Sequence, residues 1–405
     1  MKGDALAPKL SALSMLVLFC GTFFYHTALG LGHITPFLGG YATLVGGAVS
    51  VPLILILVSE IVKTGRIHLI DAAFIFFIAM FSTIIGYHFL IGEHLDNVRD
   101  HSLQVVNITA CYLIFRRIRI SSKDFKYTII VATLLMSATI IGLSNGGRFY
   151  IKETAANPEI VANYQVFAIA YMCPLIVSIA KIHQLKYRAL MFAVGFICLY
   201  VNSSRSEFVQ FALFYVAFEM CRSKYRSISP MATAAFGAMA IAALLTFNAD
   251  SANNRIANLL NLSEDKSSNV RDELTASGLE KTFDSPIFGD YGNYEKGYYI
   301  HNILSAWQDL GIFGFLVFCG ILFIPLLPLS IRVFSHGDRT RQTAAAFAFL
   351  SSTIVVLIFG KFFTYQLVGA AVGLYAAVRR EQSEAIAPEP NSNDTSESHT
   401  NYQRR

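Results

Sequence analysis

Long apolar runs separated by short polar connections dominate this chain. The runs at 38–62 and 69–92 each meet the length of about 20 mostly apolar residues that a bilayer crossing requires. Inside lipid the backbone must satisfy its own hydrogen bonds, so such runs fold as helices. With 54% hydrophobic and only 15% charged residues, the composition excludes an ordinary soluble domain. The sequence therefore predicts an all-α, polytopic membrane protein.

The same length rule predicts about twelve transmembrane helices. Two of the segments, 102–115 and 188–202, are short enough to be tilted or broken. The expected spans lie near 10–27, 38–62, 69–92, 102–115, 126–146, 161–180, 188–202, 206–221, 229–247, 311–331, 342–359 and 363–379.

Positive charges alternate along the connections. Most of the 32 Lys and Arg residues fall in every second connection or at the termini, which the positive-inside rule assigns to the cytoplasm. We therefore expect both termini to be cytoplasmic. These charges are Lys63/Arg66, Arg116/Arg117/Arg119/Lys123/Lys126, Lys181/Lys186/Arg188, Arg222/Lys224/Arg226 and Arg332/Arg339/Arg341, with Lys2, Lys9, Arg379, Arg380, Arg404 and Arg405 near the ends.

Only one of the opposite connections is long, at 248–300. It contains a helix start at Ser267-Ser268-Asn269 and a stop at Asp284-Ser285-Pro286, so we expect short helices over the membrane face. The tail after Arg380 has almost nothing apolar to bury and is predicted to be disordered. The expected units are an N-terminal bundle of nine spans (1–247), the loop with an interfacial helix (248–310), the C-terminal transmembrane helices (311–380) and the tail (381–405).

The loop re-enters apolar sequence at His301. Read as a helix from that residue, the segment places His301, Ser305 and Gln308 on one polar stripe. Gly311 and Gly314 follow, and small residues there let a helix bend or approach a neighbour closely. We expect an amphipathic interfacial helix beginning at His301 and then a span. The positive end of its dipole would favour a neutral imidazole able to accept a proton.

Three arginines fall on the side that should be poor in positive charge: Arg148, Arg205 and Arg271. Arg205 lies between two apolar runs, where a charge is costly and requires an anionic partner. The alternative interpretation is a snorkelling Arg205 paired with Glu207, a solvated Arg271, and an Arg148 that only marks a span end. Arginine binds a diphosphate bidentately, so arginines beside a base would suit transfer from a diphosphate leaving group.

The chain lacks a Gly-rich phosphate loop, a His-Glu-x-x-His pair and an acidic metal pair on the long loop. We therefore expect neither a metal nor another cofactor, and no nucleic-acid partner.

Three elements resemble the superfamily of O-antigen ligases and O-antigen polymerases. Ile300-His301-Asn302-Ile303-Leu304 followed by Asp309-Leu310-Gly311-Ile312-Phe313-Gly314 resembles its His-Asn…Leu…Gly-x-x-Gly signature. Ser204-Arg205-Ser206 resembles its Ser-Arg element, and Arg271 upstream of Phe283-Asp284-Ser285-Pro286-Ile287-Phe288-Gly289 resembles its loop arginine ahead of a Pro-x-x-Gly turn.

This resemblance implies an inverting, metal-independent glycosyltransferase of the membrane-embedded C-type, in the bacterial inner membrane with its active face periplasmic. The donor would be an undecaprenyl-diphosphate-linked oligosaccharide and the acceptor a glycan, with other polysaccharide-assembly proteins as further partners. Carried over by position, His301 is the base that activates the acceptor hydroxyl. Arg205 and Arg271 hold the diphosphate, and Arg148 is a secondary contact.

The acceptor distinguishes a ligase, which uses lipid A-core, from a polymerase, which uses another lipid-linked repeat unit. We favour the polymerase on the tyrosine-rich loop and the His-Asn segment. About twelve spans with both ends inside also describe a glycan transporter or flippase, although the long loop lies outside and between late spans. A non-catalytic scaffold of a polysaccharide assembly complex is the third possibility.

Overall fold

The computed structural model describes residues 2–37, 40–145, 147–222, 266–295 and 298–386. Within these ranges every regular element is a helix, apart from an isolated bridge between Asn145 and Arg148. The all-α class is therefore confirmed for this part of the chain.

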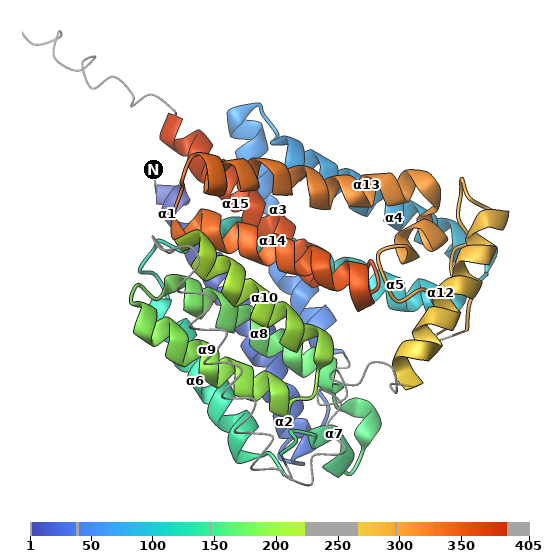
Figure 1. Ribbon diagram of the computed structural model, residues 1–405, viewed down its shortest axis with the longest axis horizontal. Helices are drawn as coiled ribbons and strands as arrows, with labels where there is room; N and C mark the ends of the chain where they lie inside the picture. The colour runs from blue at the N-terminus through green and yellow to red at the C-terminus, as the bar shows by residue number, and fades with distance from the viewer. Residues whose placement is uncertain (1, 38–39, 146, 223–265, 296–297, 387–405) are drawn as a thin grey trace, which may run out of the picture.

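The described helices are shown in chain order by colour in Figure 1. A π-helical turn at Leu16–Cys20 joins the first two, and a second one at Ile331–Ser335 extends α13. The helices are α1 Lys2–Met15, α2 Gly21–Gly30, α3 Tyr41–Thr64, α4 Leu69–Ile91, α5 Leu95–Arg117, α6 Lys126–Gly142, α7 Ile151–Thr154, α8 Tyr164–Lys181, α9 Leu185–Val201, α10 Arg205–Arg222, α12 Lys266–Asp284, α13 Ser305–Ser330, α14 Arg341–Gly360 and α15 Leu367–Ile386.

Within the described residues, six segments are long and apolar enough to cross a membrane, which makes this a membrane-embedded protein by helix length and composition. Each coincides with an expected span. The other expected spans coincide with shorter or more polar helices, except 229–247, which lies outside the described residues. The total of about twelve spans stays a prediction. The six segments are Leu6–Gly30, Tyr41–Thr64, Leu69–Ile91, Pro158–Lys181, Ser305–Ser335 and Arg341–Gly360.

Two expected boundaries were wrong. Helix α5 begins at Leu95 and not near 102; in its polar first part His101 is buried against protein, whereas Asp96 and Arg99 are exposed. Helix α15 continues to Ile386, so the tail predicted to be disordered begins with helix. An ion pair of 2.6 Å between Arg119 and Glu384 ties this extension to the bundle. The remaining tail, 387–405, lies outside the described residues.

Helices α5 and α15 pack closely along their length. A Cβ on Gly369 would lie 2.1 Å from the Ile108 carbonyl oxygen, and one on Gly373 would lie 2.4 Å from the Tyr112 carbonyl oxygen. The two glycines are four residues apart, the spacing that lets membrane helices bring their backbones together. Helices α5 and α15 are therefore packed backbone to backbone.

Charged side chains join the C-terminal ends of α3 and α5 to the N-terminal end of α4. Arg116 donates to both carboxylate oxygens of Asp71 at 2.7 Å and to Glu60 at 2.8 Å, and Arg117 also pairs with Glu60. These pairs fix the ends of α3, α4 and α5 relative to one another. The loop helix α12 lies at the opposite end of the bundle (Figure 1), and its bounds confirm the helix expected between Ser267 and Asp284.

Candidate functional site

A tight turn after α12 packs against a bend in α13. Gly311 has φ 67° and ψ −177°, a conformation that is essentially restricted to glycine, so the helix is divided at this residue. The Pro286 carbonyl accepts hydrogen bonds from the backbone N–H of Ile312 at 3.0 Å and from the Trp307 indole at 2.9 Å. Gly289, with φ 77°, faces the bend. The sequence offered a bend or a close approach to a neighbouring backbone as the role of these small residues, and Gly311 shows both.

Helix α13 begins at Ser305, and the expectation that it begins at His301 was wrong. The side-chain oxygen of Asn302 accepts a hydrogen bond from the Leu304 N–H at 2.9 Å. The backbone carbonyl of Asn302 accepts one from the Ser305 N–H at 3.0 Å. Asparagine thereby forms a local turn that replaces the first helical turn. His301 lies in the loop before the helix, so the expected effect of the helix dipole on its protonation does not apply.

The polar stripe of this helix faces the protein. Ser305, Gln308 and Asp309 are buried, whereas Phe313 beyond the bend is 67% exposed. The Ser305 hydroxyl accepts from the Phe363 N–H at 3.0 Å, and the Gln308 side chain accepts from the Ile300 N–H at 3.2 Å. The first segment of α13 therefore fastens the loop that carries His301 to the connection between α14 and α15.

His301 is half-buried among aromatic rings. Its imidazole lies 4.4 Å from the Tyr299 ring, measured between centroids, and the Tyr299 ring lies 4.6 Å from that of Phe362 and 5.7 Å from that of Tyr294. Tyr299 thus connects the candidate base to the α14–α15 connection on one side and to the long loop on the other.

A fully buried carboxylate, Asp309, lies behind these rings. Tyr294 donates its hydroxyl to Asp309 at 2.9 Å, and the Gly292 N–H lies 3.3 Å from the same carboxylate. His101 Nε2 lies 3.8 Å from Asp309, and its Nδ1 is 3.0 Å from the Tyr291 hydroxyl. Burial, and then the nearby Asp309 charge, raises the pKa of Tyr294 well above its ordinary value, so this phenol remains a protonated donor.

Arg205 is the first residue of α10, and Glu207 follows it by two positions. Glu207 is completely buried, and it accepts from Lys361 at 2.8 Å and from Tyr365 at 3.2 Å. The Ser204 hydroxyl also donates to the Glu207 carboxylate. Lys361 therefore supplies a counterion to Glu207, and the alternative of a snorkelling Arg205 paired with this carboxylate stays open.

Arg148 lies beside the same helix ends. The N–H of the next residue, Phe149, donates to the Val201 carbonyl at 3.0 Å, and Asn202 donates to the Tyr164 carbonyl at 2.7 Å. The segments carrying Arg148 and Arg205 are therefore neighbours. One terminal nitrogen of Arg148 is buried without a hydrogen-bond partner, so this cation has a donor to spare.

Arg271 lies on the loop helix α12, and its side chain lies outside the described residues. Its position is one turn before Leu274, which lines a pocket of about 320 Å³ together with Lys281, Tyr294 and Gln308. Tyr294 and Gln308 also belong to the surroundings of His301. Position 271 thus lies along the helix that covers this part of the loop.

The connection at 361–365 links the two halves of the candidate site. Lys361 pairs with Glu207 beside Arg205, and the adjacent Phe362 contacts Tyr299 beside His301. Through these contacts Arg148, Arg205 and His301 belong to one end of the bundle, which is also the end that α12 covers (Figure 1).

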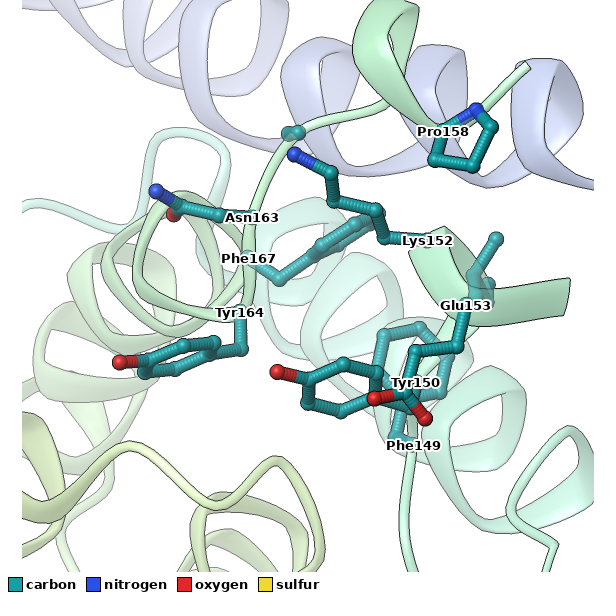
Figure 2. Close-up of a pocket in the computed structure, with 10 residues that line it drawn as sticks. Phe149, Tyr150, Lys152, Glu153, Pro158, Asn163, Tyr164 and Phe167 are labelled. Carbon is teal, nitrogen blue, oxygen red and sulfur yellow. The ribbon is translucent and has the colours of Figure 1, made fainter. Parts of the chain in front are cut away.

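A pocket of about 450 Å³ begins at Phe149, next to Arg148, and opens between α7 and the start of α8. Tyr150 and Tyr164 lie on one side with their rings stacked 6.1 Å apart, and Lys152 and Asn163 border the same opening (Figure 2). Aromatic faces bordered by amines and amides suit sugar rings, whose hydroxyls form hydrogen bonds while their C–H faces stack. Arg205 and His301 do not line this pocket.

Sequence reasoning missed Lys361, Asp309 and His101 as members of this cluster. Lys361 could have been found by the charge rule, because it is a cation in a very short connection on the side poor in positive charge. Asp309 was visible as an acid next to an apolar run. His101 gave no signal, because its partner Tyr291 is 190 positions away.

Across the described ranges, no group of three or more His, Cys, Asp or Glu side chains is placed to hold a metal ion. The site consists instead of cations, an imidazole, tyrosines and one buried carboxylate. No protein-family model matches this chain, and the search of curated proteins found no match either.

Proposed function

We propose that this protein is a membrane glycosyltransferase that transfers an undecaprenyl-diphosphate-linked glycan to an acceptor sugar hydroxyl. The observation that carries the proposal is the link made by the connection at 361–365. It brings the arginine-bearing end of α10 and the histidine-bearing loop to one end of the bundle, with Lys361 and Glu207 on one side and Phe362 and Tyr299 on the other.

In the proposed reaction the acceptor oxygen attacks the anomeric carbon of the donor, and His301 takes the hydroxyl proton. The new C–O bond forms as the bond between the anomeric carbon and the diphosphate oxygen breaks, and the diphosphate leaves with the electron pair. Attack opposite the leaving group inverts the anomeric configuration.

The cations have separate roles in this scheme. Arg205 and Arg271 hold the diphosphate and stabilise its charge as it leaves, and Arg148 is a secondary contact. The tyrosine-lined pocket beside Arg148 offers space for sugars of the growing glycan. The catalytic face is proposed to be periplasmic, in the bacterial inner membrane, with both termini in the cytoplasm.

The test compares a deletion strain complemented with the wild type, His301→Ala, Arg205→Ala or the control His336→Ala. His336 is exposed in the loop between α13 and α14, so its removal leaves the site intact. We expect His301→Ala to lower the glycan product at least about 100-fold, the usual contribution of a general base. Unchanged product in His301→Ala and Arg205→Ala, at equal protein levels, would overturn the proposal in favour of a scaffold.

The same strains identify the acceptor. Uncapped lipid A-core with intact polymer would indicate a ligase, and single-repeat products would indicate the polymerase that we favour. Glycan uptake into vesicles that persists in His301→Ala would indicate a transporter.

A further inference from the structure

A groove of about 500 Å³ runs between α4 and α13 and is bordered at one end by α15. Both helices are candidate membrane spans, so this groove faces the lipid. Its rim is strongly apolar, with Phe76, Leu316 and Ile324 each more than half exposed. An apolar surface of this kind has acyl chains as its natural contact.

The hollow exists because small residues line it. Gly320 of α13 and Ala73 of α4 both contribute to the lining. A Cβ on Gly320 would meet only the Ile324 side chain, at 3.7 Å, so this glycine is not there to let another helix approach. The space that a side chain would fill is left open, and Phe76 and Ile324 stand on either side of it.

One end of the groove is cationic. His68, which precedes α4, and Arg379 of α15 close the lining at the end where Arg116 pairs with Asp71. Arg379 is exposed, and both Arg379 and Arg332 lie close enough to Tyr375 to act on its hydroxyl electrostatically. Arg332 forms an ion pair with Asp338 at 2.9 Å. Arg379 therefore supplies the net positive charge at this end of the groove.

We infer that the groove binds one anionic phospholipid, with an acyl chain over Gly320 and the phosphate at Arg379. The apolar length and the single cationic mouth match the two parts of such a molecule, and basic pockets between membrane helices recognise anionic headgroups. The site is at the opposite end of the bundle from His301 and is independent of the proposed reaction.

The test is native mass spectrometry of the purified full chain titrated with dioleoyl phosphatidylglycerol or dioleoyl phosphatidylcholine. An arginine near an anionic surface is worth about 1 kcal/mol, so we expect the anionic lipid to bind about fivefold more tightly. Arg379→Gln should abolish this preference. Gly320→Leu should weaken the binding of both lipids, because the leucine side chain fills the groove.

Matched controls separate the site from general lipid contact. Arg339→Gln removes an exposed cation at the same end, and Gly86→Leu adds a side chain where no atom lies within 4 Å, outside the groove. Both should behave as the wild type. Equal affinity for the two lipids, or a preference that survives Arg379→Gln, would overturn the inference. If Gly320→Leu binds both lipids as the wild type does, the lipid contacts the protein through its headgroup and not through the groove. That result would also overturn the inference. If Gly320→Leu does not fold, Arg379→Gln decides.

Discussion

Gly289 and Gly311 meet backbone to backbone. A Cβ on Gly289 would lie 2.6 Å from the Gly311 nitrogen, and a Cβ on Gly311 would lie 2.0 Å from the Ile287 carbonyl oxygen. Both residues have positive φ angles. The Pro-x-x-Gly turn and the first glycine of the Gly-x-x-Gly signature are therefore two halves of one contact, which holds the loop against α13.

We expect Gly311→Ala to lower the free energy of unfolding by more than about 2 kcal/mol. Holding a non-glycine residue in this conformation costs roughly 1–3 kcal/mol, and the clash with Ile287 adds to this cost. Denaturation by SDS in mixed micelles measures the difference. Gly86→Ala is the control, because its Cβ would meet no atom within 4 Å and alanine favours a helix. Equal stability of the two variants would contradict this account of the contact.

A second prediction concerns the pair between Lys361 and Glu207. Lys361→Met leaves a completely buried carboxylate without its counterion, and breaking such a pair costs about 3–5 kcal/mol. The double variant Lys361→Met/Glu207→Gln should recover much of this loss, since no charge remains buried. The measurement is again unfolding in mixed micelles.

The partly exposed pair of Arg119 and Glu384 provides the comparison. Arg119→Met should cost less than about 1 kcal/mol, as for other exposed ion pairs. If Lys361→Met proves as mild, the pair does not hold the α14–α15 connection in place.

The apolar runs predicted the helices well, because lipid leaves a chain few alternatives to helical hydrogen bonding. The bend at Gly311 and the bounds of α12 were also predictable, since glycine and Ser-Pro punctuation act locally. Local rules failed at His301, where Asn302 forms a turn that competes with the helix start. They failed again at Leu95, because polarity indicated a connection although this polar segment is helical and buries only Val98 and His101.

The contacts within the candidate site could not be predicted from local sequence. The pair of Lys361 and Glu207 joins residues far apart in the chain, and so does the pair of His101 and Tyr291. Neither pair leaves a spacing pattern in the sequence, because both depend on which helices become neighbours. Residue types at the site could be anticipated, whereas their partners required the fold.

A third prediction concerns the hydrogen bond from Tyr294 to Asp309. Tyr294→Phe removes the hydroxyl that donates to this buried carboxylate, and we expect a loss of about 1–3 kcal/mol in stability. Tyr298→Phe is the matched control, since Tyr298 is 60% exposed and its removal should cost less than about 0.5 kcal/mol. In Asp309→Leu the further change Tyr294→Phe should have little effect, because the acceptor is already absent. Additive losses in that double variant would contradict a direct bond.

The last prediction concerns pH and the loop between α13 and α14. Burial alone would raise the pKa of Asp338, but hydrogen bonds from Thr340 and Thr343 and the charge of Arg332 outweigh it, so the pKa lies below its ordinary value of 3.8. Because the folded state holds the carboxylate more strongly, its stabilisation is present above about pH 4 and is lost as the pH falls through the lowered pKa. Asp338→Asn should therefore lower the Tm of the purified protein at pH 7, and the difference from the wild type should shrink toward pH 3. Asp124→Asn in another polar connection controls for general acid effects. A difference that stays constant from pH 7 to pH 3 would mean that packing at Asp338, and not its charge, stabilises the loop.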